Sequence, residues 1–518
     1  MMKKSTLKQS ARILLFSFLV LFQLQAIARQ GVTPEHIAEM EAVTSSAISG
    51  DASYVAFTLS VPADPYASNA PNSNHLYVLD VEEGVVKPYY TSGSVSSIQF
   101  RPEMNTVTFL TQRPGDDARS LYEIPLDGGE QEKLLSFDRN ILSYTWHADG
   151  NHVAFTAFDA AEQSDSPLPY TADVYEENRP QRKGYITNVA VEGHEPHEIM
   201  VDGSVYMIEW SPDGSQLAVS AAPTPEVDDF YMAQQVFVVD YKTKEAVAEI
   251  NNEGKIGQML WSPSGERLAL RAGADINDPI DGRILIASAR GGTPQLIDEN
   301  FEGKYEQIAW RNDSEIQFLA SESTSSVLGT IGMNGSNKNI QFRSDAHAIG
   351  SFSMADNGGL AFVASTPTHP SELFLMAGEG NVQPERATMH NPWLNNVEMG
   401  VQEVVSYETR DGEYMIDGML IYPVDYTEGE RVPVITVVHG GPEAHYSNGW
   451  LTGYSTPGQV AAAKGYAVFY PNYRGSTGRG IDFAYSSQSD LAGAEFDDVV
   501  DGVDYLIEQG VADPERIG

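Results

Sequence analysis

The stretch that decides the fold is Trp210-Ser-Pro-Asp-Gly214, which continues directly into Ser215-Gln-Leu-Ala-Val-Ser220. Proline and aspartate early in the first segment and glycine at its end suit a tight turn. The residues after the turn alternate between polar and apolar, which is typical of a strand with one buried face. The pattern therefore predicts a hairpin in which the tryptophan ends one strand and the turn leads into the next.

Variants of this hairpin recur between residues 40 and 390. Each first strand ends at an anchor residue, and the anchors in chain order are Ile48, Phe100, Trp146, Trp210, Trp261, Trp310 and Met354. Successive anchors are 52, 46, 64, 51, 49 and 44 residues apart, and repeats of about 50 residues with several strands are typical of β-propeller blades. Each repeat contains a second hairpin, which completes four strands per blade. We therefore expect an all-β, seven-bladed propeller, with another all-β array as the alternative.

The 64-residue interval holds an insertion, roughly Ala160 to Lys183, rich in proline, aspartate and glutamate. Its acidic pair, Glu176 and Glu177, allows two interpretations. The pair could belong to a solvated loop. It could also bind the α-amine of a substrate, because a loop from the rim of a blade can enter the space above a propeller.

A different architecture begins near residue 400. The expected elements are strands at Gln402–Thr409, Tyr414–Tyr422 and Val432–His439, a helix at Pro457–Lys464, a strand at Tyr466–Tyr470, a helix at Gly493–Gly510 and the entrance to a strand at Arg516–Gly518. The continuous apolar run that starts at Val432 indicates a strand buried on both faces. In the second helix, apolar residues with helical spacing are Phe496, Val499, Val500, Val503 and Leu506. Alternating strands and helices predict an α/β domain.

The most informative motif of this domain is His439-Gly440-Gly441-Pro442, at the carboxyl end of a predicted strand. In an α/β-hydrolase such a loop supplies a backbone N–H group to the oxyanion hole. Glycine has no Cβ, so its peptide can approach a reacting carbonyl closely. A plain glycine turn is the alternative, but a second glycine-bearing loop, Pro471 to Ser476, follows the next strand on the same face.

These motifs together resemble the prolyl oligopeptidase family of serine peptidases. The resemblance rests on the Trp-Ser-Pro-Asp-Gly repeats, on 438–442 (Val-His-Gly-Gly-Pro), on 471–478 (Pro-Asn-Tyr-Arg-Gly-Ser-Thr-Gly) and on 513–518 (Asp-Pro-Glu-Arg-Ile-Gly). The motifs are most similar to those of the acylaminoacyl-peptidase and bacterial dipeptidyl-peptidase branch. The resemblance implies an oxyanion loop of His439, Gly440 and Gly441, with the backbone amide of Gly441 in the hole. His439 stands where other branches have an oxyanion-binding tyrosine.

The resemblance also implies a Ser-Asp-His triad with the serine in a Gly-x-Ser-x-Gly elbow. That motif does not occur in the 518 residues, nor do a Walker A loop, a His-Glu-x-x-His helix or a dinucleotide fingerprint. We therefore expect all three triad residues beyond Gly518 and no activity from these 518 residues alone. Neither a metal site nor a cofactor is expected, and His445 is interpreted as a loop histidine because no carboxylate lies at ligand spacing.

The net charge and the N-terminal residues indicate which partners the protein has and where it is located. The formal charge of −40 disfavours nucleic-acid binding, and the absence of cysteine excludes disulfides and thiol nucleophiles. Basic residues precede a short apolar run from Ile13 to Leu24, and Ala26-Ile-Ala28 forms a small-x-small cleavage site, which together predict a signal peptide rather than a membrane anchor. We expect an exported protein, periplasmic or secreted, without stable membrane insertion after cleavage.

The expected organisation is a signal peptide at 1–28, a β-propeller at 31–398 and the N-terminal part of an α/β-hydrolase domain at 399–518. The main hypothesis is an exported serine peptidase of dipeptidyl- or acylaminoacyl-peptidase type that hydrolyses short peptides. There are two alternatives. One is a non-catalytic binding propeller with a remnant hydrolase domain, and the other is an esterase. The oligomeric state, including a homo-oligomer, is left open.

Overall fold

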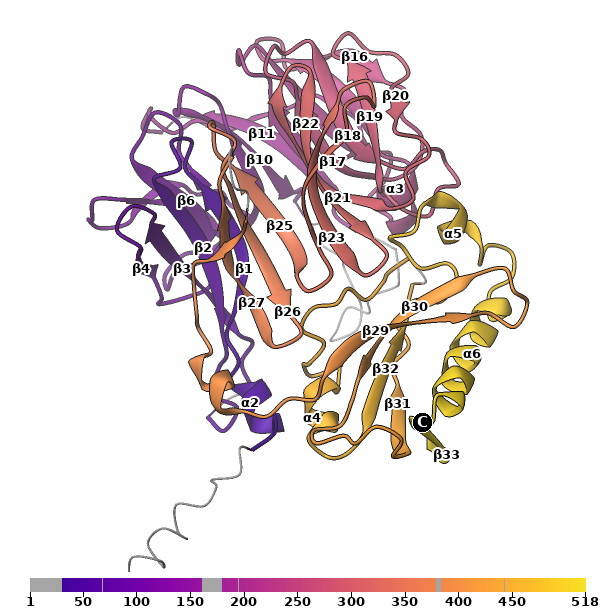
Figure 1. Cartoon of the computed structure of the whole chain (residues 1–518). Helices are drawn as coiled ribbons and strands as arrows, with labels where there is room; N and C mark the ends of the chain where they lie inside the picture. The colour runs from indigo at the N-terminus through magenta and orange to yellow at the C-terminus, as the bar shows by residue number, and fades with distance from the viewer. Residues whose placement is uncertain (1–29, 68, 161–178, 194, 379–382, 442) are drawn as a thin grey trace, which may run out of the picture.

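The computed structural model describes residues 30–518 apart from 68, 161–178, 194, 379–382 and 442. Among these residues the strands form seven four-stranded sheets and one five-stranded sheet. Figure 1 shows the four-stranded sheets arranged as a ring of blades, with the α/β portion from β29 onward beside one end of that ring. The seven-bladed propeller followed by a hydrolase portion is confirmed.

Each blade is built from four consecutive strands that pair antiparallel with their neighbours. The strands of the first four blades are β1 (Ala42–Ile48), β2 (Tyr54–Val61), β3 (Ser73–Asp80), β4 (Val85–Tyr90); β5 (Ser96–Phe100), β6 (Thr106–Thr111), β7 (Ser120–Pro125), β8 (Glu132–Leu135); β9 (Ile141–Trp146), β10 (His152–Phe158), β11 (Arg182–Asn188), β12 (His197–Glu198); and β13 (Ser204–Trp210), β14 (Gln216–Ala222), β15 (Gln235–Asp240), β16 (Ala246–Ile250). Those of the last three are β17 (Ile256–Trp261), β18 (Arg267–Ala272), β19 (Arg283–Ser288), β20 (Gln295–Ile297); β21 (Lys304–Asn312), β22 (Glu315–Glu322), β23 (Ser325–Gly332), β24 (Asn339–Ser344); and β25 (Ala348–Met354), β26 (Leu360–Thr366), β27 (His369–Met376), β28 (Glu385–Arg386).

The anchor residues lie where the sequence predicts them, at or near the end of the first strand of each blade. Trp146, Trp210 and Trp261 are the last residues of β9, β13 and β17, and all three are buried. The predicted insertion falls between β10 and β11, and most of it lies outside the described residues. A short helix that the sequence analysis missed, α3 (Val227–Met232), separates β14 from β15.

The first and last blades meet without exchanging a strand. Asn391 fastens the seam, because its side-chain Oδ1 accepts the N–H of Glu41 at 3.0 Å and its Nδ2 donates to the carbonyl of Glu41 at 2.7 Å. A parallel bridge between Gly31 and Glu398 then aligns the segments that precede and follow the ring. The chain therefore enters and leaves the propeller at one corner.

The α/β portion is a five-stranded sheet with the order β29-β30-β32-β31-β33. Its elements are β29 (Gln402–Glu408), β30 (Met415–Ile421), β31 (Val432–Thr436), α4 (Gly458–Ala462), β32 (Ala467–Pro471), α5 (Ile481–Tyr485), α6 (Ala494–Glu508) and β33 (Ala512–Ile517). Two short helices flank the propeller, namely α2 (Pro34–Ala38) before the first blade and the 3-10 helix η1 (Pro392–Asn396) after the last. The strands β31, β32 and β33 are parallel, whereas β29 and β30 are antiparallel to their neighbours. The carboxyl ends of β31 and β32 consequently meet at one edge of the sheet.

Three details of this portion correct the sequence analysis. The strand expected at Val432–His439 ends at Thr436, and Val438 remains 51 % exposed because the chain already turns into the glycine loop. The last strand begins at Ala512 rather than at Arg516, and Pro514 is accommodated by a register shift opposite Val432 and Val434. The helix α5 was not expected.

The buried face of α6 also differs from the expected one. Phe496 and Val500 are 62 % and 48 % exposed, whereas Glu495, Asp498, Gly502 and Leu506 are buried. A Cβ on Gly502 would lie 2.7 Å from ring atoms of Phe469 and Tyr407. The helix is therefore oriented by the close approach at Gly502, by the contacts of Asp498 and by the burial of Leu506, whereas Phe496 and Val500 face solvent.

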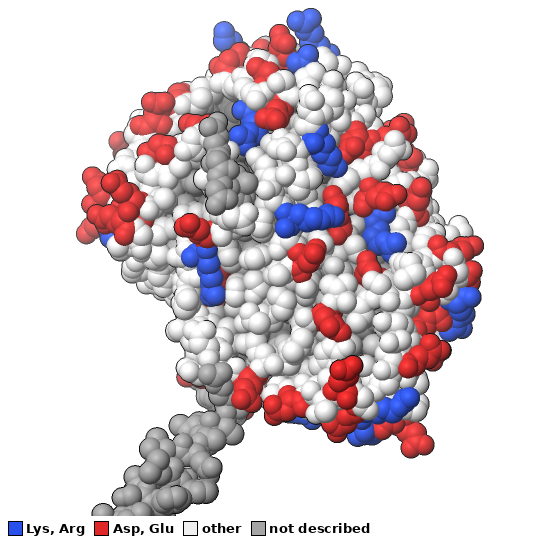
Figure 2. Space-filling model, in the orientation of Figure 1, with Lys and Arg blue, Asp and Glu red and all other residues white. Residues whose placement is uncertain are grey.

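The surface reflects the acidic composition. Figure 2 shows acidic side chains spread over the displayed face and outnumbering the basic ones. No helix among the described residues is long and apolar enough to cross a membrane. The segment predicted as a signal peptide, 1–28, lies outside the described residues.

Candidate active site

Two loops meet at the carboxyl ends of β31 and β32. The side chain of Asn472 joins them, since its Oδ1 accepts the N–H of Tyr446 at 2.7 Å and its Nδ2 donates to the carbonyl of Tyr446 at 2.9 Å. The N–H of Thr477 donates to the carbonyl of Ala444 at 3.0 Å. The loops at 437–448 and 471–478, which the sequence places on one face, are thus joined by hydrogen bonds along much of their length.

His439 lies between these loops. Its ring stacks on Tyr473 with a centroid separation of 4.5 Å, and its Nε2 is 3.1 Å from the Ser476 hydroxyl. The hydroxyl of Tyr473 donates to the carbonyl of His439 at 2.6 Å. Burial lowers the pKa of His439, although the nearby Gly440 carbonyl opposes this shift. A neutral imidazole at pH 7 therefore fixes the beginning of the glycine loop against the second loop.

Gly440 and Gly441 follow as an exposed pair. The hydrogen bonds found among the described residues include none donated by the N–H of either glycine. Gly441 has φ near +128°, and a Cβ at this position would lie 2.3 Å from the N atom of Glu443. Only glycine fits this backbone, so the loop presents amide groups without side chains. This geometry suits an anionic oxygen, but the oxyanion role of His439, Gly440 and Gly441 remains a prediction.

The second loop is held from below by a buried ion pair. The guanidinium of Arg474 contacts both carboxylate oxygens of Asp498, with Nε–Oδ2 at 2.8 Å and Nη2–Oδ1 at 2.7 Å, and the Arg474 backbone N–H also reaches Oδ2. Asp498 on α6 is fully buried, and Asp411 adds a further contact to Nη2 at 2.8 Å. The hydrogen bonds to Asp498 raise the pKa of Arg474. The loop thus depends on a charge supplied by a helix.

His445 has the position of a structural loop histidine. Its Nδ1 is 2.7 Å from the Thr477 hydroxyl, and its Nε2 is 3.1 Å from the Ser447 hydroxyl. Burial lowers the pKa of His445 to about 4. The ring is therefore neutral at pH 7 and contributes to the junction of the two loops through hydroxyl partners, as the sequence-based interpretation of a loop histidine requires.

The propeller faces these loops. Ser323, in the turn between β22 and β23, donates its N–H to the carbonyl of Gly478 at 2.7 Å, and its hydroxyl contacts Asp417. Asn448 donates its N–H to the carbonyl of Thr324 at 3.2 Å. A cavity of about 380 Å³ lies between the start of several propeller strands and Glu443, two residues after Gly441. The candidate site is therefore an interface between the two parts of the chain.

The remaining sequence-predicted site residues are not located. Glu176 and Glu177, assigned to a possible amine site, lie outside the described residues. Asn472, Arg474 and Asp498 were not identified as site-forming residues. Asn472 and Arg474 lie inside a recognised motif, whereas nothing near Asp498 distinguishes it from the many other acidic residues. The spacing of Asp498 and Gly502, four residues apart on one helix face, is the signal that could have revealed the buried face of α6.

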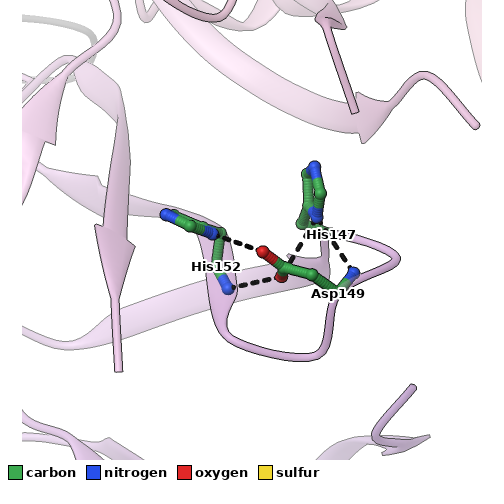
Figure 3. Close-up of side chains that lie close together, drawn as sticks. All are labelled: His147, Asp149 and His152. Atoms are coloured by element: carbon green, nitrogen blue, oxygen red, sulfur yellow. Dashed lines mark hydrogen bonds and ion pairs between the residues drawn. The ribbon is translucent and has the colours of Figure 1, made fainter. Parts of the chain in front are cut away.

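A separate group on the propeller, His147, Asp149 and His152, has ligand atoms within 4.8 Å of one another (Figure 3). These atoms already have partners. Nδ1 of His147 accepts the N–H of Asp149, Nδ1 of His152 is 2.7 Å from Asp149 Oδ2, and Nε2 of His152 faces Asn188. The aspartate holds the position of Asp213 in the Trp-Ser-Pro-Asp-Gly turn. The group stabilises a hairpin, and a metal ion would have to displace this network.

The C-terminal part of the chain matches the model of a known protein family. Residues 453–518, which include β32, the second loop and α6, match the model described as the prolyl oligopeptidase family. The resemblance to the prolyl oligopeptidase family is confirmed. The match begins after the His439 loop, so it does not cover that loop, whose oxyanion role stays a prediction.

Relatives and solved structures extend the likeness to most of the chain. The chain is 27 % identical over 527 residues to the uncharacterised peptidase YuxL of Bacillus subtilis, a match that covers 94 % of this chain and 78 % of that protein. It is 22 % identical over 317 residues to dipeptidyl-peptidase 5 of Aspergillus fumigatus, with 58 % of this chain and 43 % of that protein covered.

Among solved structures, an acylaminoacyl peptidase in complex with Z-Gly-Gly-Phe-chloromethyl ketone has a TM-score of 0.72 and 21 % identity, over 93 % of this chain and 73 % of that chain. A puromycin hydrolase has a TM-score of 0.69 and 14 % identity, over 95 % of this chain and 76 % of that chain. These likenesses show that the chain shares its fold with these two solved structures. The chain spans about three quarters of each of these structures.

The ion pair below the second loop yields a stability prediction. Asp498→Ala leaves the Arg474 guanidinium buried without its main partner, and we expect the free energy of unfolding to fall by about 3–5 kcal/mol. Asp497→Ala is a matched control on the same helix, because Asp497 pairs with Arg410 at the surface, and such pairs contribute roughly 0–1 kcal/mol. Urea unfolding of both variants measures the difference, and equal losses would contradict the assignment.

The histidine at the loop junction yields a pH prediction. The pKa of His445 is about 4 in the folded chain and about 6.5 in a model peptide, so the unfolded chain binds the proton first as the pH falls. The stabilisation is complete above pH 6.5 and is lost as the pH falls toward 4. We expect His445→Gln to flatten the pH dependence of the unfolding midpoint between pH 6.5 and 4.5. Parallel curves for the two proteins would show that His445 is not responsible.

Proposed function

We propose that the chain forms the propeller and the N-terminal part of the catalytic domain of an exported serine peptidase that hydrolyses short peptides. The observation that carries the proposal is the Gly440-Gly441 segment, whose N–H groups have no acceptor among the described residues and whose backbone admits only glycine at 441. The segment lies beside the interface with the propeller, which supports a role in binding the substrate. The dipeptidyl-peptidase 5 and acylaminoacyl peptidase likenesses support a dipeptidyl- or acylaminoacyl-type activity.

In the proposed reaction, a serine activated by histidine attacks the carbonyl carbon of a peptide or acyl-peptide. The carbonyl oxygen becomes negatively charged, and the N–H of Gly441 donates a hydrogen bond to it. Such a preorganised donor stabilises the transition state more than the ground state. His439 and the second loop hold this amide in place without entering the reaction themselves. The serine, aspartate and histidine of the triad are assigned to residues after Gly518.

The propeller would limit access to the site. A ring of blades seated against the loops admits short or unfolded peptides and excludes folded proteins. Export is proposed from the basic residues, the apolar run and the small-x-small site at the beginning of the chain. The acidic surface suits a protein that remains soluble outside the cell.

The reading frame downstream of codon 518 provides the direct test. We expect it to encode a Gly-x-Ser-x-Gly elbow, and we expect the encoded protein to hydrolyse dipeptidyl and acetylated-residue chromogenic substrates. A fluorophosphonate should label that serine, whereas the 518-residue chain alone should show neither labelling nor turnover. A frame that closes without the elbow, together with peptide binding by the propeller, would favour the non-catalytic binding protein instead.

The oxyanion assignment predicts the effect of one methyl group. In the protein with its triad, Gly441→Ala should lower kcat by a factor of about 10²–10³, because the new Cβ collides with Glu443 and turns the amide away. Gly440→Ala adds the same methyl group into open space and should have a clearly smaller effect. Steady-state kinetics of both variants decide the question. Near-normal kcat in Gly441→Ala would reduce the loop to a structural turn.

A further inference from the structure

The cavity between the propeller and Glu443 is lined by aromatic and basic side chains. Aromatic side chains come from β13 and α3, where Tyr206 and Phe230 have ring centroids 4.6 Å apart and Tyr231 lies 5.0 Å from Phe230. Basic side chains come from the beginnings of β11, β17 and β21 and from β18. Its volume of about 380 Å³ is within the usual range of small-ligand sites, roughly 300–1,000 Å³.

Two of the four cations of this cavity are already neutralised. Arg271 pairs with Asp281 at 2.6 Å, and Lys304 pairs with Glu306 at 2.9 Å. Within the described part of the chain neither Lys255 nor Arg182 has a carboxylate within ion-pair distance, and the Lys255 ammonium donates to the carbonyl of Pro279. Glu443 at the opposite wall is exposed. The cavity therefore has an excess of positive charge, concentrated at Arg182 and Lys255.

The aromatic walls orient these two cations. The guanidinium carbon of Arg182 lies 4.9 Å from the ring centroid of Tyr206 and 5.4 Å from that of Phe158, and Nζ of Lys255 lies 5.5 Å from that of Tyr231. Stacking occupies the faces of a guanidinium and leaves its N–H edge available for a planar carboxylate. The cavity thus combines an apolar surface with donors for an anion.

The backbone of β17 makes room for this arrangement. The pairing of β17 with β18 shifts its register between Ile256 and Gln258. At Gly257 a Cβ would lie 2.0 Å from Oδ2 of Asp281 and 2.2 Å from Nη2 of Arg271. Glycine at the bulge therefore lets the Arg271–Asp281 pair lie against the strand, where it forms one wall. Arg182 and Lys255 are then the lining cations that have no carboxylate partner among the described residues.

We propose that this cavity binds a carboxylate of the peptide substrate, with an apolar or aromatic side chain of the same peptide against Tyr206 and Phe230. The inference rests on the proposed peptidase function and names its substrate class. Glu443 connects the cavity to the oxyanion loop, so a short peptide extends from Gly441 to the cations. In a chain with a formal charge of −40, two neighbouring cations without a carboxylate partner among the described residues are what allows an anion to bind. The carboxylate is either the C-terminal group or an acidic side chain.

Calorimetric titration of the 518-residue chain with three peptides tests this proposal without requiring turnover. Ala-Ala-Phe should bind about tenfold more tightly than Ala-Ala-Phe-amide at low salt, because the charge-assisted contacts of its carboxylate with Arg182 and Lys255 are lost in the amide. Tight binding of Ala-Asp-Phe-amide would assign the site to an acidic side chain, and its weak binding would assign the site to the C-terminus. Arg182→Gln and Lys255→Gln should each remove most of the preference.

Lys242→Gln, which removes a charge from an exposed turn of the same propeller, should retain the full preference. The affinity for Ala-Ala-Phe-amide serves as a folding control, because a variant with an intact cavity keeps it. Equal binding of all three peptides, no binding of any peptide, or an unchanged preference for the carboxylate-bearing peptide in Arg182→Gln would overturn the proposal. Since catalysis is not measured, these results are separate from the fluorophosphonate and turnover tests of the peptidase function.

Discussion

The contact between Arg474 and Asp498 is the interaction on which the candidate site depends. A guanidinium and a carboxylate that leave water together lose hydration, and only near-ideal geometry recovers it. Here both carboxylate oxygens and a backbone N–H are used. The loop after β32 is thereby fixed on α6. Tyr473 and Ser476, on either side of Arg474, are then placed to hold His439, and His439 begins the glycine loop.

The same hierarchy explains how the propeller and the α/β portion share one site. Asn472 and Thr477 connect the second loop to the first, and the carbonyl of Gly478 accepts the N–H of Ser323 from the propeller. The cavity at the propeller face reaches the first loop at Glu443. Rigid sheets on both sides thus position a small number of loop groups, which is where binding residues are commonly found.

How much could be predicted from the sequence differs between the two parts. The anchors Trp146, Trp210 and Trp261 repeat a local pattern, so the blades and their number follow from periodicity. The glycine loop and its neighbour were recognised because their residues are contiguous. Asp498 was missed because its burial depends on Arg474, 24 residues away, and on the close approach at Gly502. The cavity was missed because Arg182, Lys255 and Lys304 come from three blades and meet only in the folded ring.

The corner at which the chain enters and leaves the propeller has a mechanical consequence. Gly31 pairs with Glu398, and Glu41 pairs with Asn391, so both ends of the ring are gathered at one point. Only the segment after Asn391 joins the ring covalently to the α/β portion. Among the described residues, contacts such as the hydrogen bond from Ser323 to Gly478 link the two parts without a covalent connection. The ring is therefore attached to the α/β portion by one covalent segment at this corner and by non-covalent contacts along the rest of the interface.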